Sequence, residues 1–323
     1  MDYKEIAIRN MILKIRAGSH LFGTNTPESD LDYIGVFMPT RQMVYGFGHC
    51  EVVEMHVKAK DESGRNTADA VDFSAYEFRK FVALAMQNNP NILHLLFANE
   101  ENVLEADKAF GRALLDAAPL FPHKGAHHRF VAYAHAQLHK MRIKPENYEA
   151  LQRALEFLNG QDDNAVLGEF RTSNIFRNTD DTGKHLKVGD LSFEAGVFVK
   201  KARRMVAERI SKATSRASLF TKYGYDTKFA SNVIHLLKEG IDLMKYGRLV
   251  YPLPYADLIL DIKRGVYENE QIEEMAEALT EEARRAFDGT TLPAHPRTKE
   301  IELFLMDRME RWLVSSETSR REE

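Results

Sequence analysis

The sequence predicts an α+β fold, in which a small mixed β-sheet head is followed by a mostly α-helical C-terminal domain. Short apolar runs between polar or glycine-containing segments fill the first 100 residues or so and are typical of strands. Beyond about residue 105, apolar residues recur at helical spacing. The 323 residues are enough for two domains. We expect these domains at 1–100 and 101–314, with a flexible tail at 315–323.

In the head, a helix is expected at 3–10, and Ser74 with Glu77 three residues later forms a capping box that predicts a helix start at Ser74. The expected strands are 11–15, 30–37, 52–57 and 69–73. The helices expected in the body are 105–117, 124–142, 146–159, 193–213, 226–246, 255–264, 270–287 and 298–314. Between them, 160–192 is expected to be a loop with one short hairpin.

Composition narrows the class of protein. The formal net charge is −4, so no overall basic field indicates nucleic acid. The single cysteine, Cys50, excludes an intramolecular disulfide and argues against a Cys/His zinc cluster. The N-terminus is charged and no apolar run approaches the length of a membrane span. We therefore expect a cytoplasmic, soluble protein without a membrane partner.

Two aspartates close the stretch from Gly18 to Asp32. Asp30 and Asp32 are two residues apart on a predicted strand, so both carboxylates are expected on one face. Like charges held so close repel unless a cation lies between them, and aspartate oxygens suit Mg²⁺. The alternative is a solvated turn, because Ser-Asp-X-Asp is common in loops.

The same stretch begins with a small-residue turn. Gly18 allows close approach of a ligand to the backbone, and Ser19 adds a hydroxyl beside the N–H groups of a following helix, which suits phosphate. Metal-assisted phosphoryl transfer usually needs a further carboxylate, for which Asp72 is the best candidate. Asp69 is the second choice, and we interpret it as a surface charge.

These residues together resemble a known signature. The Gly-Ser turn, the spacer and the Asp-Leu-Asp at 30–32 are similar to the DNA polymerase β nucleotidyltransferase superfamily. The longer string 18–37 resembles the YcgL-type predicted nucleotidyltransferases of bacteria and their phages. That similarity extends to 72–81 and 89–91, and it returns at 222–230.

The resemblance implies a two-metal nucleotidyltransferase. Asp30 and Asp32 would bind two Mg²⁺ ions, with Mn²⁺ as the alternative, while Asp72 would bind the catalytic ion and help to deprotonate the acceptor. Gly18 and Ser19 would hold the β- and γ-phosphates. A nucleoside monophosphate would pass from an NTP, ATP or another, to a hydroxyl, and pyrophosphate would leave. The acceptor stays open between an RNA or tRNA end, a protein and a small molecule, and so does homo-oligomerisation.

A second motif lies in the body, in the Lys-Tyr-Gly-Tyr-Asp-Thr-Lys run that ends at Lys228. Tyr223 and Tyr225 could stack a base and Lys228 could neutralise a phosphate. The alternative is a plain helix N-terminus with packed tyrosines. On the following helix this chain has Asn232 and His235, where the resembling sequences carry a His and then an Arg.

Two further groups of residues could bind a ligand. Histidines cluster on one stretch and are His123, His127, His128, His135 and His139. A surface or interface helix is favoured over a metal site there, because no HExxH pattern is present. The basic run 200–204 is read as a solvated helix face, with an RNA or nucleotide groove as the alternative. The competing function is a non-catalytic nucleotide sensor or an antitoxin-like protein-binding module.

Overall fold

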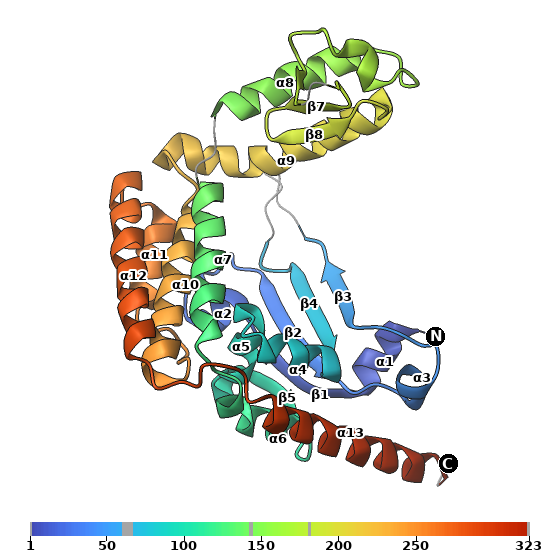
Figure 1. Ribbon diagram of the computed structural model, residues 1–323, viewed down its shortest axis with the longest axis vertical. Helices are drawn as coiled ribbons and strands as arrows, with labels where there is room; N and C mark the ends of the chain where they lie inside the picture. The colour runs from blue at the N-terminus through green and yellow to red at the C-terminus, as the bar shows by residue number, and fades with distance from the viewer. Residues whose placement is uncertain (1, 60–66, 142–144, 180–181, 322–323) are drawn as a thin grey trace. The chain divides into compact units, whose positions relative to one another are not determined.

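The computed structural model describes residues 2–59, 67–141, 145–179 and 182–321, and it confirms the α+β class (Figure 1). By their contacts, residues Met1–Leu138 and Lys228–Glu323 form one compact unit, called unit 1, and His139–Thr227 form another, unit 2. The expected division at residue 100 therefore does not coincide with these units, and it stays a prediction about the extent of a catalytic domain. Among the residues described, no helix is both long and apolar enough to span a bilayer.

The elements of the first part of the chain are α1 (Tyr3–Arg9), β1 (Met11–Arg16), α2 (Gly18–Phe22), β2 (Leu31–Phe37), α3 (Arg41–Tyr45), β3 (Val52–Val57), β4 (Val71–Glu77), α4 (Phe78–Met86), α5 (Pro90–Leu96), β5 (Val103–Ala106), α6 (Gly111–Asp116) and α7 (Gly125–Met141). Those that follow are α8 (Pro145–Asn159), β6 (Arg177–Asn178), β7 (His185–Val188), β8 (Leu191–Glu194), α9 (Val199–Tyr223), α10 (Thr227–Tyr246), α11 (Ala256–Arg264), α12 (Asn269–Gly289) and α13 (Thr298–Arg321). Short 3-10 turns, η1 to η3, lie at Glu100–Asn102, Ala118–Leu120 and Leu167–Phe170.

The head of unit 1 is a five-stranded mixed sheet in the order β3-β4-β2-β1-β5. β2 and β4 run parallel, whereas the other neighbouring pairs are antiparallel. The sheet core includes Ile15, Phe37 and Ala75, all fully buried. α4 packs on β2 and β4, and its apolar residues Phe78 and Phe81 are also fully buried (Figure 1). The parallel pair β2 and β4 sets the register of the candidate site.

The helix start predicted at Ser74 was wrong. β4 continues to Glu77, and Ser74 pairs with Ile34 in β2. The helix begins after Glu77, whose carboxylate accepts a hydrogen bond from the Lys80 N–H at 3.3 Å. The local capping preference of Ser74 does not decide the structure here, because parallel pairing with β2 already satisfies the backbone groups of Ser74 within the sheet.

Two other head predictions need correction. The strand expected from Asp30 begins at Leu31, so Asp30 lies in the preceding loop. The helix predicted from residue 105 overlaps β5, which pairs antiparallel with β1, and α6 begins only at Gly111. A short edge strand has too few residues to show a periodicity of its own.

Unit 2 contains a second, three-stranded antiparallel sheet in the order β6-β7-β8. The hairpin expected within 160–192 is present as β7 and β8, joined by Gly189 at φ +55° and Asp190, as two-residue hairpin loops require. β6 was not predicted. Because β8 occupies Leu191–Glu194, α9 begins at Val199 rather than at residue 193. α8, α9 and the sheet share a core that includes Leu158, Leu186 and Phe193.

The last four helices agree closely with prediction, except at the C-terminus. α13 continues to Arg321, so the frayed tail expected from residue 315 is helical in its described part. The helix returns to the head, where the Trp312 indole N–H donates to the Pro39 carbonyl at 3.0 Å and an Arg308 guanidinium N–H donates to the Ala109 carbonyl at 3.0 Å. Residues far apart in the sequence therefore build unit 1.

Candidate active site

Three aspartates converge at one end of the parallel strand pair. Asp32 in β2 and Asp72 in β4 occupy directly opposite positions in the register. Residues paired in this way point to the same face of a sheet. Asp30 reaches the same place from the loop before β2, and one carboxylate oxygen from each residue lies within 4.8 Å of the others. The set proposed from the sequence is thus assembled in space.

The electrostatics of this cluster favour a bound cation. The pKa of Asp32 is raised to about 6, first by burial and then by the neighbouring charges of Asp30 and Asp72, while Lys228 acts in the opposite direction. Three convergent carboxylates match the oxygen ligands that Mg²⁺ and Mn²⁺ prefer. The residues therefore fit a divalent metal ion of the expected kind.

The Gly18 turn is built against Asp32. The Ala17 N–H donates to the Asp32 carbonyl at 2.8 Å, and Gly18 follows at φ +58°. A Cβ atom on Gly18 would lie only 2.1 Å from Asp32 Oδ2. Glycine is needed here both for its backbone angle and for the space that the carboxylate occupies. Ser19 comes next in α2, and its carbonyl accepts from the Thr24 N–H at 2.9 Å.

Two lysines from the helical part of unit 1 lie near the carboxylates. Lys228, in the first turn of α10, is exposed, and its charge lowers the pKa of Asp32. Lys263 in α11 donates to Thr24 Oγ1 at 3.0 Å. Burial lowers the pKa of Lys263, Lys228 lowers it further and Asp30 raises it, which shows that these charges are mutual neighbours. Two cations beside three carboxylates suit a metal-bound polyphosphate.

Sequence reasoning found Lys228 but missed Lys263 and His56. Lys263 is a lone lysine in an amphipathic helix, and nothing in its neighbourhood marks it. His56 lies opposite Asp72 in the antiparallel pair of β3 and β4, and its Nδ1 is 2.7 Å from Asp72 Oδ1. This contact fixes the orientation of the Asp72 carboxylate. Only the pairing of β3 with β4, which the sequence did not reveal, could have indicated it.

The two tyrosines and Asp69, which were also considered from the sequence, lie outside the group of three aspartates. Tyr223 ends α9, and Tyr225 follows it and is only 1% exposed, which suits the packed alternative. Both belong to unit 2, so their nucleotide-binding roles stay predictions. Asp69 is exposed in the turn before β4, as expected of a surface charge.

Three histidines of this stretch pack against other residues, whereas His135 is exposed. His123 is buried, and its ring nitrogens bond to the Met86 carbonyl at 3.0 Å and to the Gly125 N–H at 3.1 Å. The rings of His127 and His128 pack against Phe287. The side chain of His139 lies outside the described part.

In the basic run 200–204, Arg203 binds Asp163 at 2.6 Å and the Leu158 carbonyl at 2.7 Å. It therefore ties α9 to the end of α8. Lys200, Lys201 and Arg204 are exposed, as the solvated alternative predicted.

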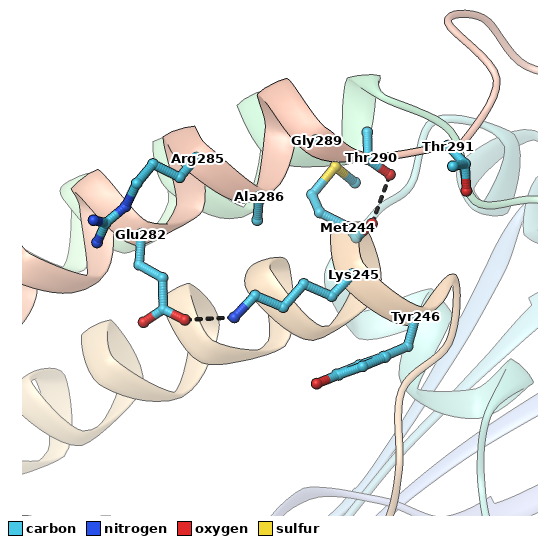
Figure 2. A pocket seen from close by; sticks show the side chains of 9 residues that line it. All are labelled: Met244, Lys245, Tyr246, Glu282, Arg285, Ala286, Gly289, Thr290 and Thr291. Atoms are coloured by element: carbon cyan, nitrogen blue, oxygen red, sulfur yellow. Dashed lines mark hydrogen bonds and ion pairs between the residues drawn. The ribbon is translucent and has the colours of Figure 1, made fainter.

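A separate open pocket lies between the end of α10 and α12 (Figure 2). Its polar side chains are partly paired with the protein itself: Lys245 Nζ is 2.6 Å from Glu282 Oε1, and the Thr290 hydroxyl donates to the Met244 carbonyl at 2.6 Å. None of the predicted site residues lines it. The carboxylate cluster, not this pocket, is the candidate active site.

Comparison with known proteins agrees with the site. Residues 3–319 match the RNA repair pathway DNA polymerase beta family, RlaP, and the chain belongs to this family. Membership confirms the polymerase β superfamily inferred above and supports a nucleotidyltransferase. The YcgL-type branch stays a prediction.

Individual relatives add little about function. A protein of Enterobacteria phage T4, described as an uncharacterized 38.9 kDa protein in the nrdC-mobD intergenic region, is 26% identical over 310 residues, covering 85% of this chain and 89% of the phage protein. A crystal structure of a nucleotidyltransferase-like protein from Exiguobacterium sibiricum 255-15 is 10% identical and covers 89% of this chain and 72% of its own, with a TM-score of 0.26. That similarity is too low to support an argument.

Replacing Gly18 by Ala should disturb the carboxylates. The new Cβ would overlap Asp32 Oδ2, and the left-handed backbone costs an L-residue about 1–2 kcal/mol. We expect lower thermal stability and Mn²⁺ binding weakened by about tenfold or more, measured by calorimetry. Gly196→Ala is the control, because its Cβ would meet no atom within 4 Å. Unchanged Mn²⁺ affinity in Gly18→Ala would contradict the role given to the turn.

Replacing Asp32 by Asn should stabilise the metal-free protein while removing metal binding. Because the pKa of Asp32 is raised from 3.8 to about 6 on folding, the ionised group opposes folding above that range, and the cost disappears as the pH falls through it. We expect a gain of roughly 1–2 kcal/mol in the free energy of unfolding at about pH 8, after allowance for solvent screening, and none at about pH 4. Denaturant titrations at both pH values would measure it. If Asp32→Asn were no more stable than wild type at about pH 8, or were less stable there, the role given to burial and to the neighbouring carboxylates would be contradicted.

Proposed function

We propose that this protein is a divalent-metal-dependent nucleotidyltransferase that moves a nucleoside monophosphate from an NTP to a terminal hydroxyl of RNA, with release of pyrophosphate. The observation that carries the proposal is the convergence of Asp30, Asp32 and Asp72 beside the Gly18 turn. The RNA repair pathway named for the family supports RNA as the acceptor, among the classes that the sequence left open.

In this proposal Asp30, Asp32 and Asp72 hold the metal ions, which supply charge stabilisation at the reacting phosphate. The acceptor hydroxyl oxygen forms a bond to the α-phosphorus, the bond from that phosphorus to the bridging oxygen breaks, and pyrophosphate leaves. Asp72, oriented by His56, accepts the hydroxyl proton. Its partly exposed carboxylate is open to an acceptor from solvent.

The two lysines serve the leaving group. Negative charge accumulates on pyrophosphate as the bond to the α-phosphorus breaks, and fixed cations stabilise that charge. Lys263 is held in place by Thr24, whose hydroxyl and carbonyl oxygens lie at 3.0 and 3.3 Å from Nζ. Lys228 lies close enough to affect the pKa of both Asp32 and Lys263. We assign both lysines to the β- and γ-phosphates.

The charge of unit 2 supports an RNA acceptor. Residues 139–227 contain 16 Lys and Arg against 12 Asp and Glu, whereas the rest of the chain contains 28 against 36. Unit 2 therefore carries a net positive charge, although the net charge of the whole chain is negative. Basic surfaces supply the salt-dependent part of nucleic-acid affinity.

One pocket of unit 2 concentrates this charge. Its lining includes Arg153 of α8, Arg177 of β6 and Lys187 of β7, together with two asparagines, and none of its described lining residues is acidic. Arg177 and Lys187 are paired directly across the two strands. Like charges in that arrangement repel, and a phosphate between them would relieve the repulsion. The backbone of an RNA supplies such phosphates.

The test is incorporation of labelled NMP into RNA oligonucleotides that end in a free 3′-hydroxyl, with a 3′-phosphate RNA as the blocked control. Wild-type protein with Mg²⁺ or Mn²⁺ should extend the free end and release pyrophosphate, and Asp30→Asn and Asp72→Asn should lower the rate by about a hundredfold or more. Asp69→Asn, an exposed neighbouring aspartate, should retain activity. No product with any NTP, or activity that survives loss of the cluster, would refute the proposal.

The role of unit 2 is tested separately by RNA affinity. Arg153→Glu, Arg177→Glu and Lys187→Glu combined should weaken binding of single-stranded RNA and flatten its salt dependence by about 0.7 in log–log slope for each lost phosphate contact. Lys299→Glu, an exposed lysine of unit 1, is the matched control. Equal affinities and slopes in the two proteins would show that this pocket does not hold the acceptor, while leaving the carboxylate chemistry intact.

A further inference from the structure

A second cluster of potential metal ligands lies within unit 1, away from solvent. His94 of α5 and His235 of α10 each place Nε2 3.0 Å from the same oxygen, Oε2 of Glu239. The two histidines are 6% exposed and Glu239 is 1% exposed. One ligand atom from each residue lies within 4.8 Å of the others. The members of this cluster come from two helices far apart in the sequence, so their spacing along the chain does not reveal it.

Hydrogen bonding alone does not satisfy this cluster. His94 Nε2 bonds to Glu239 Oε2, and His235 Nε2 forms an ion pair with the same oxygen at 3.0 Å but without good hydrogen-bond geometry. A buried imidazole in this geometry leaves part of its hydrogen-bonding capacity unused, which is costly. The ion pairs that the described residues form with Glu239 come from histidines, not from lysine or arginine. A cation between the three atoms would satisfy both imidazoles and the carboxylate.

The surroundings resemble the support that metal ligands usually receive. The Tyr251 hydroxyl donates to the other oxygen, Oε1 of Glu239, at 2.6 Å, which fixes the carboxylate. The His94 and His235 rings have centroids 5.8 Å apart, and the Phe22 ring lies 5.0 and 4.3 Å from them.

We propose that His94, His235 and Glu239 bind one transition-metal ion, for which Zn²⁺ is the best match. Two imidazole nitrogens and one carboxylate oxygen form a donor set typical of Zn²⁺, whereas Mg²⁺ prefers oxygen ligands alone. A water molecule or the second carboxylate oxygen would complete the coordination. This ion is distinct in chemistry and in residues from the ions held by the three aspartates.

The location of this site gives the ion a structural role next to the proposed nucleotide site. Phe22, which packs on both histidines, is the last residue of α2, the helix that begins with Gly18 and Ser19. Its carbonyl accepts from the Leu253 N–H at 3.1 Å, close in the chain to Tyr251. A bound ion would hold α5, α10 and this end of α2 together, and so support the turn that carries Gly18.

The test is metal content and metal titration of the full chain without a histidine tag. To separate the two sites, Asp30, Asp32 and Asp72 are first replaced by Asn. In that background we expect about one equivalent of Zn²⁺ by mass spectrometry, and Co²⁺ should give the visible absorption of a four-coordinate nitrogen–oxygen site. His94→Gln and His235→Gln should abolish both signals, and Tyr251→Phe should weaken binding by about 10–100-fold.

His128→Gln, which removes an exposed histidine outside the cluster, is the matched control and should bind like the parent. Thermal melts with and without Zn²⁺ show whether each variant folds, and the metal-dependent rise in melting temperature should vanish only in the cluster variants. Absence of Zn²⁺ and Co²⁺ binding in the well-folded background protein, or binding that survives in His235→Gln and Tyr251→Phe alike, would overturn the proposal. The cluster would then be a buried hydrogen-bonded ion pair.

Discussion

The parallel, in-register pairing of β2 with β4 is the constraint on which the site depends. It places Asp32 directly opposite Asp72, so that two like charges are held together by backbone hydrogen bonds rather than by attraction. The repulsion is tolerated because the same strands bury apolar residues such as Phe37 and Ala75 farther along. The fold therefore stabilises an arrangement that is electrostatically unfavourable without a cation, as expected of a binding site.

Two lysines near the carboxylates come from parts of the chain that are far from the aspartates in sequence. Lys228 and Lys263 come from helices that follow unit 2 in the chain, yet they belong to the same compact unit as the aspartates. The basic charge is instead concentrated in unit 2. In the proposed function, this separation would place the metal chemistry in unit 1 and the attraction of RNA in unit 2.

Structural elements could be predicted from the sequence where the residue types of a site and the local hydrophobic pattern point to the same element. Gly18 and the three aspartates lie in or beside strands that their own residues predict, and the long helices show clear periodicity. Prediction failed where tertiary pairing decides the structure. At Ser74, pairing of β4 with β2 replaced the expected helix cap, and the segment expected to begin a helix at residue 105 pairs instead with β1 as β5. Lys263, His56 and the histidine–glutamate cluster could not be found, because their proximity arises from folding and not from spacing along the chain.

The most direct test of this account is the anomalous scattering of Mn²⁺ in crystals grown with a non-hydrolysable NTP. We expect Mn²⁺ peaks within coordinating distance, about 2.0–2.3 Å, of oxygens of Asp30, Asp32 and Asp72. We also expect the β- and γ-phosphates beside Ser19, with Lys228 and Lys263 on their outer side. Mn²⁺ bound elsewhere, or a nucleotide bound away from the three aspartates, would contradict the central claim that this cluster is the catalytic centre.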